Sequence, residues 1–426
     1  MKNLQEKPKQ QKLWTHNFTL ITVGSVISML GNSLSGFAMS LLVLDYTGST
    51  FYFALYMAVY MLPRIVMPVL SGPFLDRTSR RRAIYMLDFI SSGLYALFAV
   101  ILHTGWFNFG AFLVACFLIG TLDSVYQVAY ESFYPLLISE GNYSKAYSVS
   151  STLETMTMVM LPVSAIVYRW VGIVPLFIFD AVTFLAAAVL ETQIRVDETQ
   201  IQKGGAEDGN PGKAALSSGI HRFREDLREG MKYLIHEKGL LAVAIYFAFS
   251  TFGTGADSAI TLPYFKANFK EGVYVYFLVW GMAVLGRIIG GGVHYKIKLP
   301  AKTKYRIALT VYIVISVLDG SYLYCPIPAM MAMCFATGML GITSYNIRIS
   351  ATQSYVPDDK KGRFNGIFDM LCTVGMLVGE LVSGALATFL PNRVVLSACM
   401  GIVLLAAVIV IGGHRNEVSA IYNTQV

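Results

Sequence analysis

The feature that most constrains this chain is a series of uninterrupted apolar stretches, each long enough to cross a bilayer. About 20 consecutive apolar residues span a hydrocarbon core of roughly 30 Å as a helix. Of the 426 residues, 55% are hydrophobic and only 14% are charged. This composition excludes a disordered chain, and the apolar runs lack the alternation of membrane β-barrel strands. We therefore expect an all-α integral membrane protein.

Twelve apolar spans can be marked along the sequence. They lie at about 17–44, 50–74, 83–103, 107–134, 146–169, 172–194, 239–263, 273–295, 304–325, 328–351, 364–390 and 394–413. A polar segment at 195–238, which ends in a charged and predicted helical stretch from His221, separates the first six from the last six. The two sets are nearly equal in length, which predicts twelve transmembrane helices in two pseudo-symmetric six-helix bundles. The predicted order is an N-terminus at 1–16, a bundle at 17–194, a linker at 195–238, a bundle at 239–413 and a C-terminus at 414–426.

The distribution of Lys and Arg predicts the orientation. Counted in the loops, linker, termini and span ends, 26 of these residues lie on the side of the termini and linker and four lie on the other side. Because cationic loops stay on the cytoplasmic side, we expect both termini and the linker to be cytoplasmic in a multi-pass plasma-membrane protein. The pI of about 9.0 then reflects topology, so the expected surroundings are a lipid bilayer and no nucleic acid. A cleaved signal peptide is not expected, because the first span is too long.

The loop between the second and third spans carries a motif. It reads Gly72-Pro-Phe-Leu-Asp76-Arg77-Thr-Ser-Arg80-Arg81-Arg82. This resembles the loop motif G-x-x-x-D-R-x-x-R-R of the major facilitator superfamily. The resemblance implies a twelve-helix transporter in which Gly72, Asp76, Arg77, Arg80 and Arg81 form a conformational latch to the start of the eleventh helix, at 362–365.

Two further stretches bear on the branch of that family. Pro63-Arg64 resembles the bacterial drug and macrolide efflux branch. The G-P-x-x-G stretch typical of drug–proton antiporters is reduced here to Leu161-Pro162-Val163-Ser164-Ala165, without its glycines. The resemblance to the superfamily is therefore closer than the resemblance to its drug antiporters.

Ionisable residues inside spans mark candidate functional positions, because a charge in the bilayer is costly. By residue count, Asn32, Arg64, Asp123 and Glu154 lie near mid-depth, and helical spacing places Asp123 on a polar face of the fourth span. The residues that we predict to line a cavity or couple protons are Glu154, Asp123, Arg64, Gln127, Glu131, Asn32, Tyr130 and Asp369. Glu154 is the first candidate for the proton carrier, with Arg64 as its displaceable counter-ion or that of Asp123.

These features favour a monomeric secondary transporter that works by alternating access and exports amphipathic, drug-like small molecules in exchange for protons. The proton gradient supplies the energy, and no cofactor or metal is expected. Alternatives are an importer or facilitator of a small polar solute, an exporter of siderophores or lipids, and a membrane-embedded enzyme. An enzyme is disfavoured because all six histidines lie in termini, loops or span ends, and no Walker A sequence occurs.

Overall fold

The computed structural model describes residues 12–75, 78–139, 142–196, 213–296 and 300–423, and within these ranges the side chains of some residues, Glu154 among them, are not described. Every regular element in the described residues is helical. Eleven of the described helical segments are long and apolar enough to cross a membrane. The predicted all-α membrane fold is therefore confirmed.

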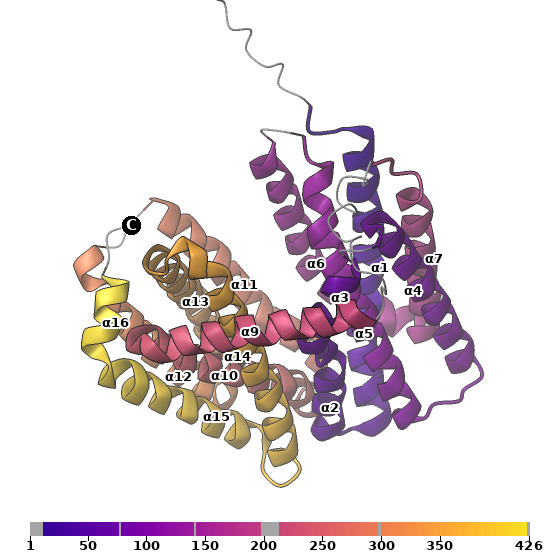
Figure 1. Ribbon diagram of the computed structural model, residues 1–426. Coiled ribbons are helices and arrows are strands. Elements are labelled where there is room, and N and C mark those ends of the chain that lie inside the picture. The colour runs from indigo at the N-terminus through magenta and orange to yellow at the C-terminus, as the bar shows by residue number, and fades with distance from the viewer. Residues whose placement is uncertain (1–11, 76–77, 140–141, 197–212, 297–299, 424–426) are drawn as a thin grey trace, which may run out of the picture. The chain divides into compact units, whose positions relative to one another are not determined.

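The helices follow the predicted spans in order (Figure 1). The first set is α1 (His16–Thr47), α2 (Thr50–Met61), α3 (Pro63–Leu75), α4 (Arg80–His103), α5 (Phe109–Phe133), α6 (Tyr143–Val171) and α7 (Ile173–Glu191). The second set is α9 (Lys213–His236), α10 (Lys238–Asn268), α11 (Gly272–Lys296), α12 (Lys304–Ser321), α13 (Ile327–Tyr355), α14 (Asp358–Leu386), α15 (Asn392–Ala406) and α16 (Arg415–Tyr422). The predicted span at 50–74 is divided into α2 and α3 just before Pro63, a residue that cannot continue the helical hydrogen bonds. The predicted span at 146–169 corresponds to α6, whose described apolar stretch is Met160–Val171.

The helices group into two compact units. Unit 1 comprises Met1–Leu42 and Leu62–Ile220, and unit 2 comprises Val43–Met61 and His221–Val426. Val43–Met61, which chain order places in the first predicted bundle, makes its contacts within unit 2. Its helix α2 packs on α10 and α14, where Ala54 meets Gly384.

Close helix packing in unit 2 depends on glycine. Along the contact of α14 with α10, a Cβ atom at Gly375 or Gly379 would overlap a backbone carbonyl oxygen of α10. The contact of α11 with α13 repeats this arrangement at Gly286 and Gly338. Gly375 and Gly379 are four residues apart, the spacing that lets two membrane helices approach with their backbones.

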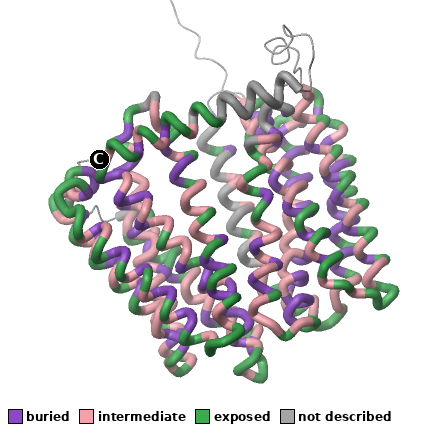
Figure 2. Tube along the Cα trace, turned by 60° about the horizontal axis from the view of Figure 1, so that its bottom comes forward, coloured by how far each residue is buried: buried purple, intermediate pink, exposed green. Residues whose placement is uncertain are grey.

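Unit 1 is held together by aromatic and polar contacts among α1, α4 and α7. The ring of Tyr95 on α4 stacks on that of Phe184 on α7 at 5.6 Å, and Ser92 Oγ donates to the carbonyl oxygen of Ala181 at 2.7 Å. Gly31 on α1 lies against Asp180 of α7 with no room for a Cβ atom. Buried and exposed positions interleave along the helices (Figure 2).

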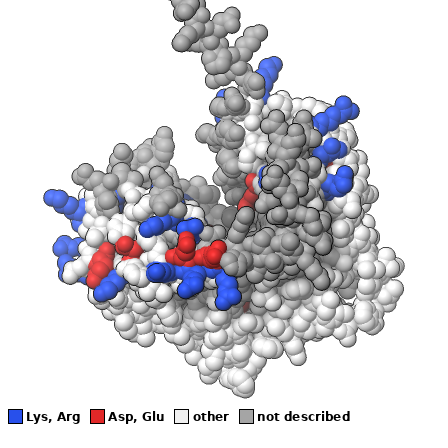
Figure 3. Space-filling view, in the orientation of Figure 1, with Lys and Arg blue, Asp and Glu red and all other residues white. Residues whose placement is uncertain are grey.

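Helix α9 crosses the helices of unit 2 (Figure 1). It begins at Lys213, earlier than the helix predicted from His221. Its Gly230 contacts Ile367 of α14, and Arg363 forms an ion pair with its Glu229 at 2.7 Å. Described charged side chains gather along α9, whereas the lower part of the face in view is nearly free of them (Figure 3).

Candidate functional site: a polar cavity in unit 1

Unit 1 contains a cavity of about 670 Å³. Helices α1, α3, α4, α5 and α7 contribute its walls. The lining residues are Ser28, Met29, Asn32, Arg64, Pro68, Asp88, Ser91, Leu122, Asp123, Ser124, Tyr126, Gln127, Val128, Glu131 and Phe184. The cavity is large enough for a drug-sized molecule, because ligand pockets typically occupy about 300–1,000 Å³.

Helical periodicity explains how α5 supplies so much of the wall. Asp123, Gln127 and Glu131 are spaced by four residues, so their side chains share one face. Gln127 Nε2 donates a hydrogen bond to Glu131 Oε1 at 2.7 Å. This bond holds the two exposed side chains together at one end of the polar face.

The α1 wall is positioned from α4. The hydroxyl of Tyr95 donates to Oδ1 of Asn32 at 3.4 Å, and Tyr95 itself is fixed by its stacking on Phe184. Phe184 also lines the cavity. The same aromatic contact therefore orients one polar and one apolar part of the wall.

The lining of the cavity has more acidic than basic groups. Three carboxyl groups, those of Asp88, Asp123 and Glu131, face the space that Arg64 also lines. Met29, Leu122 and Phe184 add apolar surface. With all four groups ionised the lining is net negative, which suits a ligand that carries both a positive charge and apolar bulk.

The structure brings five of the predicted site residues together: Asn32, Arg64, Asp123, Gln127 and Glu131 all line this cavity. Their part in transport stays a prediction. Tyr130 is not in the lining, and its ring stacks between those of Tyr126 and Tyr134.

Two other predicted site residues are not among the described lining of this cavity. Asp369 belongs to α14 of unit 2 and is exposed. Glu154 lies on α6, but its side chain is outside the described part of the structure.

Two acidic residues were missed by the sequence prediction. Asp88 lines the cavity, although by residue count it falls toward a helix end. Glu191 ends α7 and is fully buried. The available signal was the scarcity of acids in apolar spans, but only the packing of α4 on α7 brings these two together.

The predicted latch is described only in part. Asp76 and Arg77 lie outside the described residues, as does the immediate environment of Gly72. Arg80 Nη1 donates to the carbonyl oxygen of Ser132 at 2.9 Å, and Arg81 Nη2 to that of Thr192 at 2.5 Å. Both arginines therefore bind the C-terminal ends of helices, where the helix dipole favours cations.

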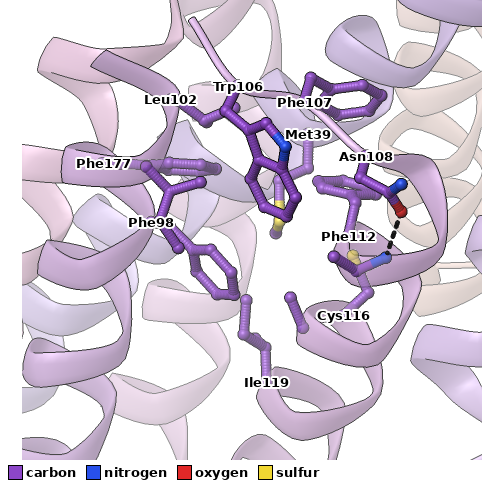
Figure 4. A pocket seen from close by; sticks show the side chains of 13 residues that line it. Met39, Phe98, Leu102, Trp106, Phe107, Asn108, Phe112, Cys116, Ile119 and Phe177 are labelled. Atoms are coloured by element: carbon purple, nitrogen blue, oxygen red, sulfur yellow. Dashed lines mark hydrogen bonds between the residues drawn. The ribbon is translucent and has the colours of Figure 1, made fainter. Parts of the chain in front are cut away.

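A second cavity in unit 1 is smaller and apolar. It measures about 40 Å³, and the rings of Phe98, Trp106, Phe112 and Phe177 surround it (Figure 4). Asn108 at its edge accepts a hydrogen bond from the backbone N–H of Ala111 at 3.0 Å. Since no Asp, Glu, Lys, Arg or His lines it, this pocket does not fit a role in ion coupling.

A metal centre is not indicated in the part of the chain that the structure describes. No group of three or more His, Cys, Asp or Glu side chains there is placed to hold a metal ion. The polar cavity combines its carboxyl groups with an arginine, which does not favour a bound metal cation.

Membrane-crossing helices in two units, one of which encloses a polar cavity, are the arrangement of a membrane transporter. The model of the Major Facilitator Superfamily matches residues 21–379, so the chain belongs to that family.

Curated relatives agree with this assignment. The chain is 24% identical to the uncharacterized MFS-type transporter YkuC of Bacillus subtilis (strain 168), over 91% of this chain and 90% of that protein. It is 22% identical to the uncharacterized MFS-type transporter YvqJ of the same organism, over 88% and 87% of the two chains.

Among solved structures, the chain resembles a bacterial homologue of the iron transporter ferroportin in its inward-facing state. The TM-score is 0.67 with 13% identity, and the match covers 97% of this chain and 100% of the other. At this identity the likeness concerns the fold alone.

Proposed function

We propose that this protein exports amphipathic cations across the plasma membrane in exchange for protons, by alternating access and as a monomer. The observation that carries the proposal is the cavity of unit 1, in which three carboxyl groups and one arginine share about 670 Å³ with apolar side chains. The surplus of Lys and Arg on the side of the termini and linker supports a cytoplasmic position for both.

The lining supports selection by charge and by shape. Asp123 and Glu131 attract a cation, and Arg64 prevents the pocket from becoming so negative that a ligand is held too firmly to leave. Phe184 contributes a ring face for cation–π contact, and Met29 contributes a side chain that adapts to different shapes. These features support a ligand class defined by charge and apolar bulk.

Protons are a sufficient source of energy for this exchange. A one-for-one exchange of a proton for a monovalent cation moves no net charge, so the membrane potential does no work on it. A tenfold proton gradient, which is one pH unit, is worth about 1.4 kcal/mol. One proton per cycle at that pH difference therefore supports export against about a tenfold gradient.

The test is proton movement in inverted membrane vesicles that contain the protein, recorded with a pH-sensitive dye. The panel comprises lipophilic cations, neutral antibiotics and polar metabolites. We expect proton flux with the lipophilic cations and its loss in Asp123→Asn. Vesicles from cells without the protein report the background.

Other outcomes would replace the proposal. A response confined to a sugar, amino acid or organic acid would favour an importer or facilitator of a small polar solute. A response confined to siderophores or lipids would favour an exporter of those compounds. Transport of a lipophilic cation with no proton flux would support export and show that it is not coupled to protons.

A further inference from the structure

Two buried carboxyl groups lie close together at the wall of the cavity in unit 1, which Asp88 lines. Asp88 on α4 is 1% exposed and Glu191 at the end of α7 is fully buried. Their carboxyl groups lie close enough to act on each other, and the hydroxyl of Tyr126 on α5 donates to Oε1 of Glu191 at 3.3 Å. Three helices thus converge on one acid pair.

Two buried carboxyl groups that lie close together without a hydrogen-bond donor between them favour a bound proton. No hydrogen-bond donor from the described residues reaches Oδ2 of Asp88 or Oε2 of Glu191, and both atoms are buried. Two ionised carboxylates have no hydrogen between them and repel each other, whereas one proton shared between them satisfies both. The geometry therefore identifies a proton as the ligand of this pair.

The charged and titratable groups around the pair come from several helices. From α5, Asp123 acts on Asp88, and Tyr126 and Tyr130 interact with Glu191. From α7, Asp180 acts on Asp88. Asp180 is itself held by Ser35 and Thr183. Gly24 of α1 packs against Glu191 and brings no charge.

Two arginines lie in the same region. Arg64 of α3 lines the cavity together with Asp88. Arg81 binds the carbonyl oxygen of Thr192, the residue that follows Glu191. The groups that act on Asp88 most directly are thus carboxyl groups, and they resist a second negative charge at the pair.

The cavity provides a path for the proton. Asp88 and Tyr126 line it, and Asp123 and Arg64 share the same wall. We propose that the Asp88–Glu191 pair is the proton-binding site that couples transport to the proton gradient, an inference that rests on the proposed exchange. A cation that enters beside Asp123 stabilises the fully ionised pair, and the shared proton passes from a carboxyl oxygen to water in the cavity. When the cation leaves, the pair takes up a proton again.

The first experiment needs no ligand. Infrared difference spectra of the purified protein across a pH jump record the carbonyl stretch of protonated carboxyl groups. We expect Asp88→Asn and Glu191→Gln each to shift the frequency of the same band and the pH at which it appears, because the proton belongs to both groups. The double exchange Asp88→Glu/Glu191→Asp, which keeps two acids, should retain the band. A shift in only one single variant, or in neither, would overturn the shared proton.

The second experiment measures coupling with tetraphenylphosphonium as the probe. In proteoliposomes with a pH difference of one unit, one-for-one exchange allows the wild type about a tenfold accumulation. Asp88→Asn and Glu191→Gln should only equilibrate the probe, although counterflow down its own gradient persists and shows that they are folded. Accumulation by either variant equal to that of the wild type would overturn the inference.

Two comparisons separate this inference from the prediction that Glu154 carries the proton and from the proposed exchange itself. Glu154→Gln tests the carrier predicted from the sequence, and loss of proton-driven accumulation in that variant alone would assign the coupling there. If the wild type moves the probe without protons, the proposed exchange fails, whereas the infrared experiment still decides whether the pair shares a proton.

Discussion

Charged side chains within the spans have different surroundings in the two units. In unit 1, Arg64 lines an open cavity together with three acids. In unit 2, the guanidinium of Arg348 lies 4.6 Å from the ring centroid of Phe368 and 5.1 Å from that of Phe247. The first arginine is exposed to a space that a ligand can enter, whereas the second is covered by aromatic faces.

The buried acids of unit 2 differ from each other in their hydrogen bonds. Asp257 of unit 2 accepts hydrogen bonds from Thr261 at 2.8 Å and Tyr322 at 2.9 Å. Glu380 is fully buried, and neither of its carboxyl oxygens has a hydrogen-bond partner among the described residues. Together with the glycine contacts of its helices, this indicates close packing in unit 2.

The largest effect should come from filling a glycine contact of unit 2. A Cβ atom in Gly379→Ala would overlap the carbonyl oxygen of Phe252, and overpacking a core costs about 1–3 kcal/mol. Gly401→Ala is the matched control, because open space surrounds that position, and helix propensity should make it neutral or stabilising. Thermal unfolding in detergent measures both. Equal stability of the two variants would show that α10 and α14 do not depend on this approach.

A second test compares the buried acids of the two units. Glu380→Met removes two unsatisfied oxygens and should stabilise the protein by about 1–2 kcal/mol, since an unpaired buried polar group costs about 1–3 kcal/mol. Glu191→Met leaves Asp88 and Tyr126 without their partner and should destabilise it by a similar amount. The melting temperature of each variant is compared with that of the wild type, and the sign of the change tests the prediction. If both variants were destabilised, Glu380 would have a stabilising contact that the burial and bonding pattern does not reveal.

The third prediction concerns ligand affinity. Asp123→Asn should weaken binding of tetraphenylphosphonium about tenfold, or about 1.4 kcal/mol, because it removes one negative charge from the cavity. Asp369→Asn removes the same charge from unit 2 and should leave the affinity unchanged. Equilibrium binding to the purified proteins measures both. An equal loss in the two variants would place Asp369 at the ligand site as well.

The smallest effect belongs to an ion pair near the end of α1. Lys266 Nζ lies 2.5 Å from Oδ1 of Asp45, and the two side chains are 28% and 45% exposed. Such pairs contribute about 0.2–1 kcal/mol, so Asp45→Asn should lower stability only slightly, and less at high salt. A double-mutant cycle with Lys266→Gln measures the coupling energy. A coupling well above this range would give the pair a structural role.

Much of the site could be anticipated from α5, and less from the other helices. Asp123, Gln127 and Glu131 lie on one helix, where spacing alone fixes a common face. Tyr130 follows the same approximate spacing, but its ring stacks between those of Tyr126 and Tyr134, and spacing along the helix does not reveal this packing. Asp88 and Glu191 belong to different helices, so no pattern along the chain could pair them.

The sequence by itself determined that the chain is helical, that it crosses a membrane many times and in what order its spans follow. These properties follow from local hydrophobicity, because a backbone in lipid must satisfy its hydrogen bonds within each helix. The tertiary structure decided that Val43–Met61 packs in unit 2, that Arg348 is covered by rings while Arg64 lines a cavity, and that Asp88 and Glu191, distant in the sequence, are buried close together. Each of these depends on which faces of separate helices meet, and that choice is made by packing between residues far apart in the chain.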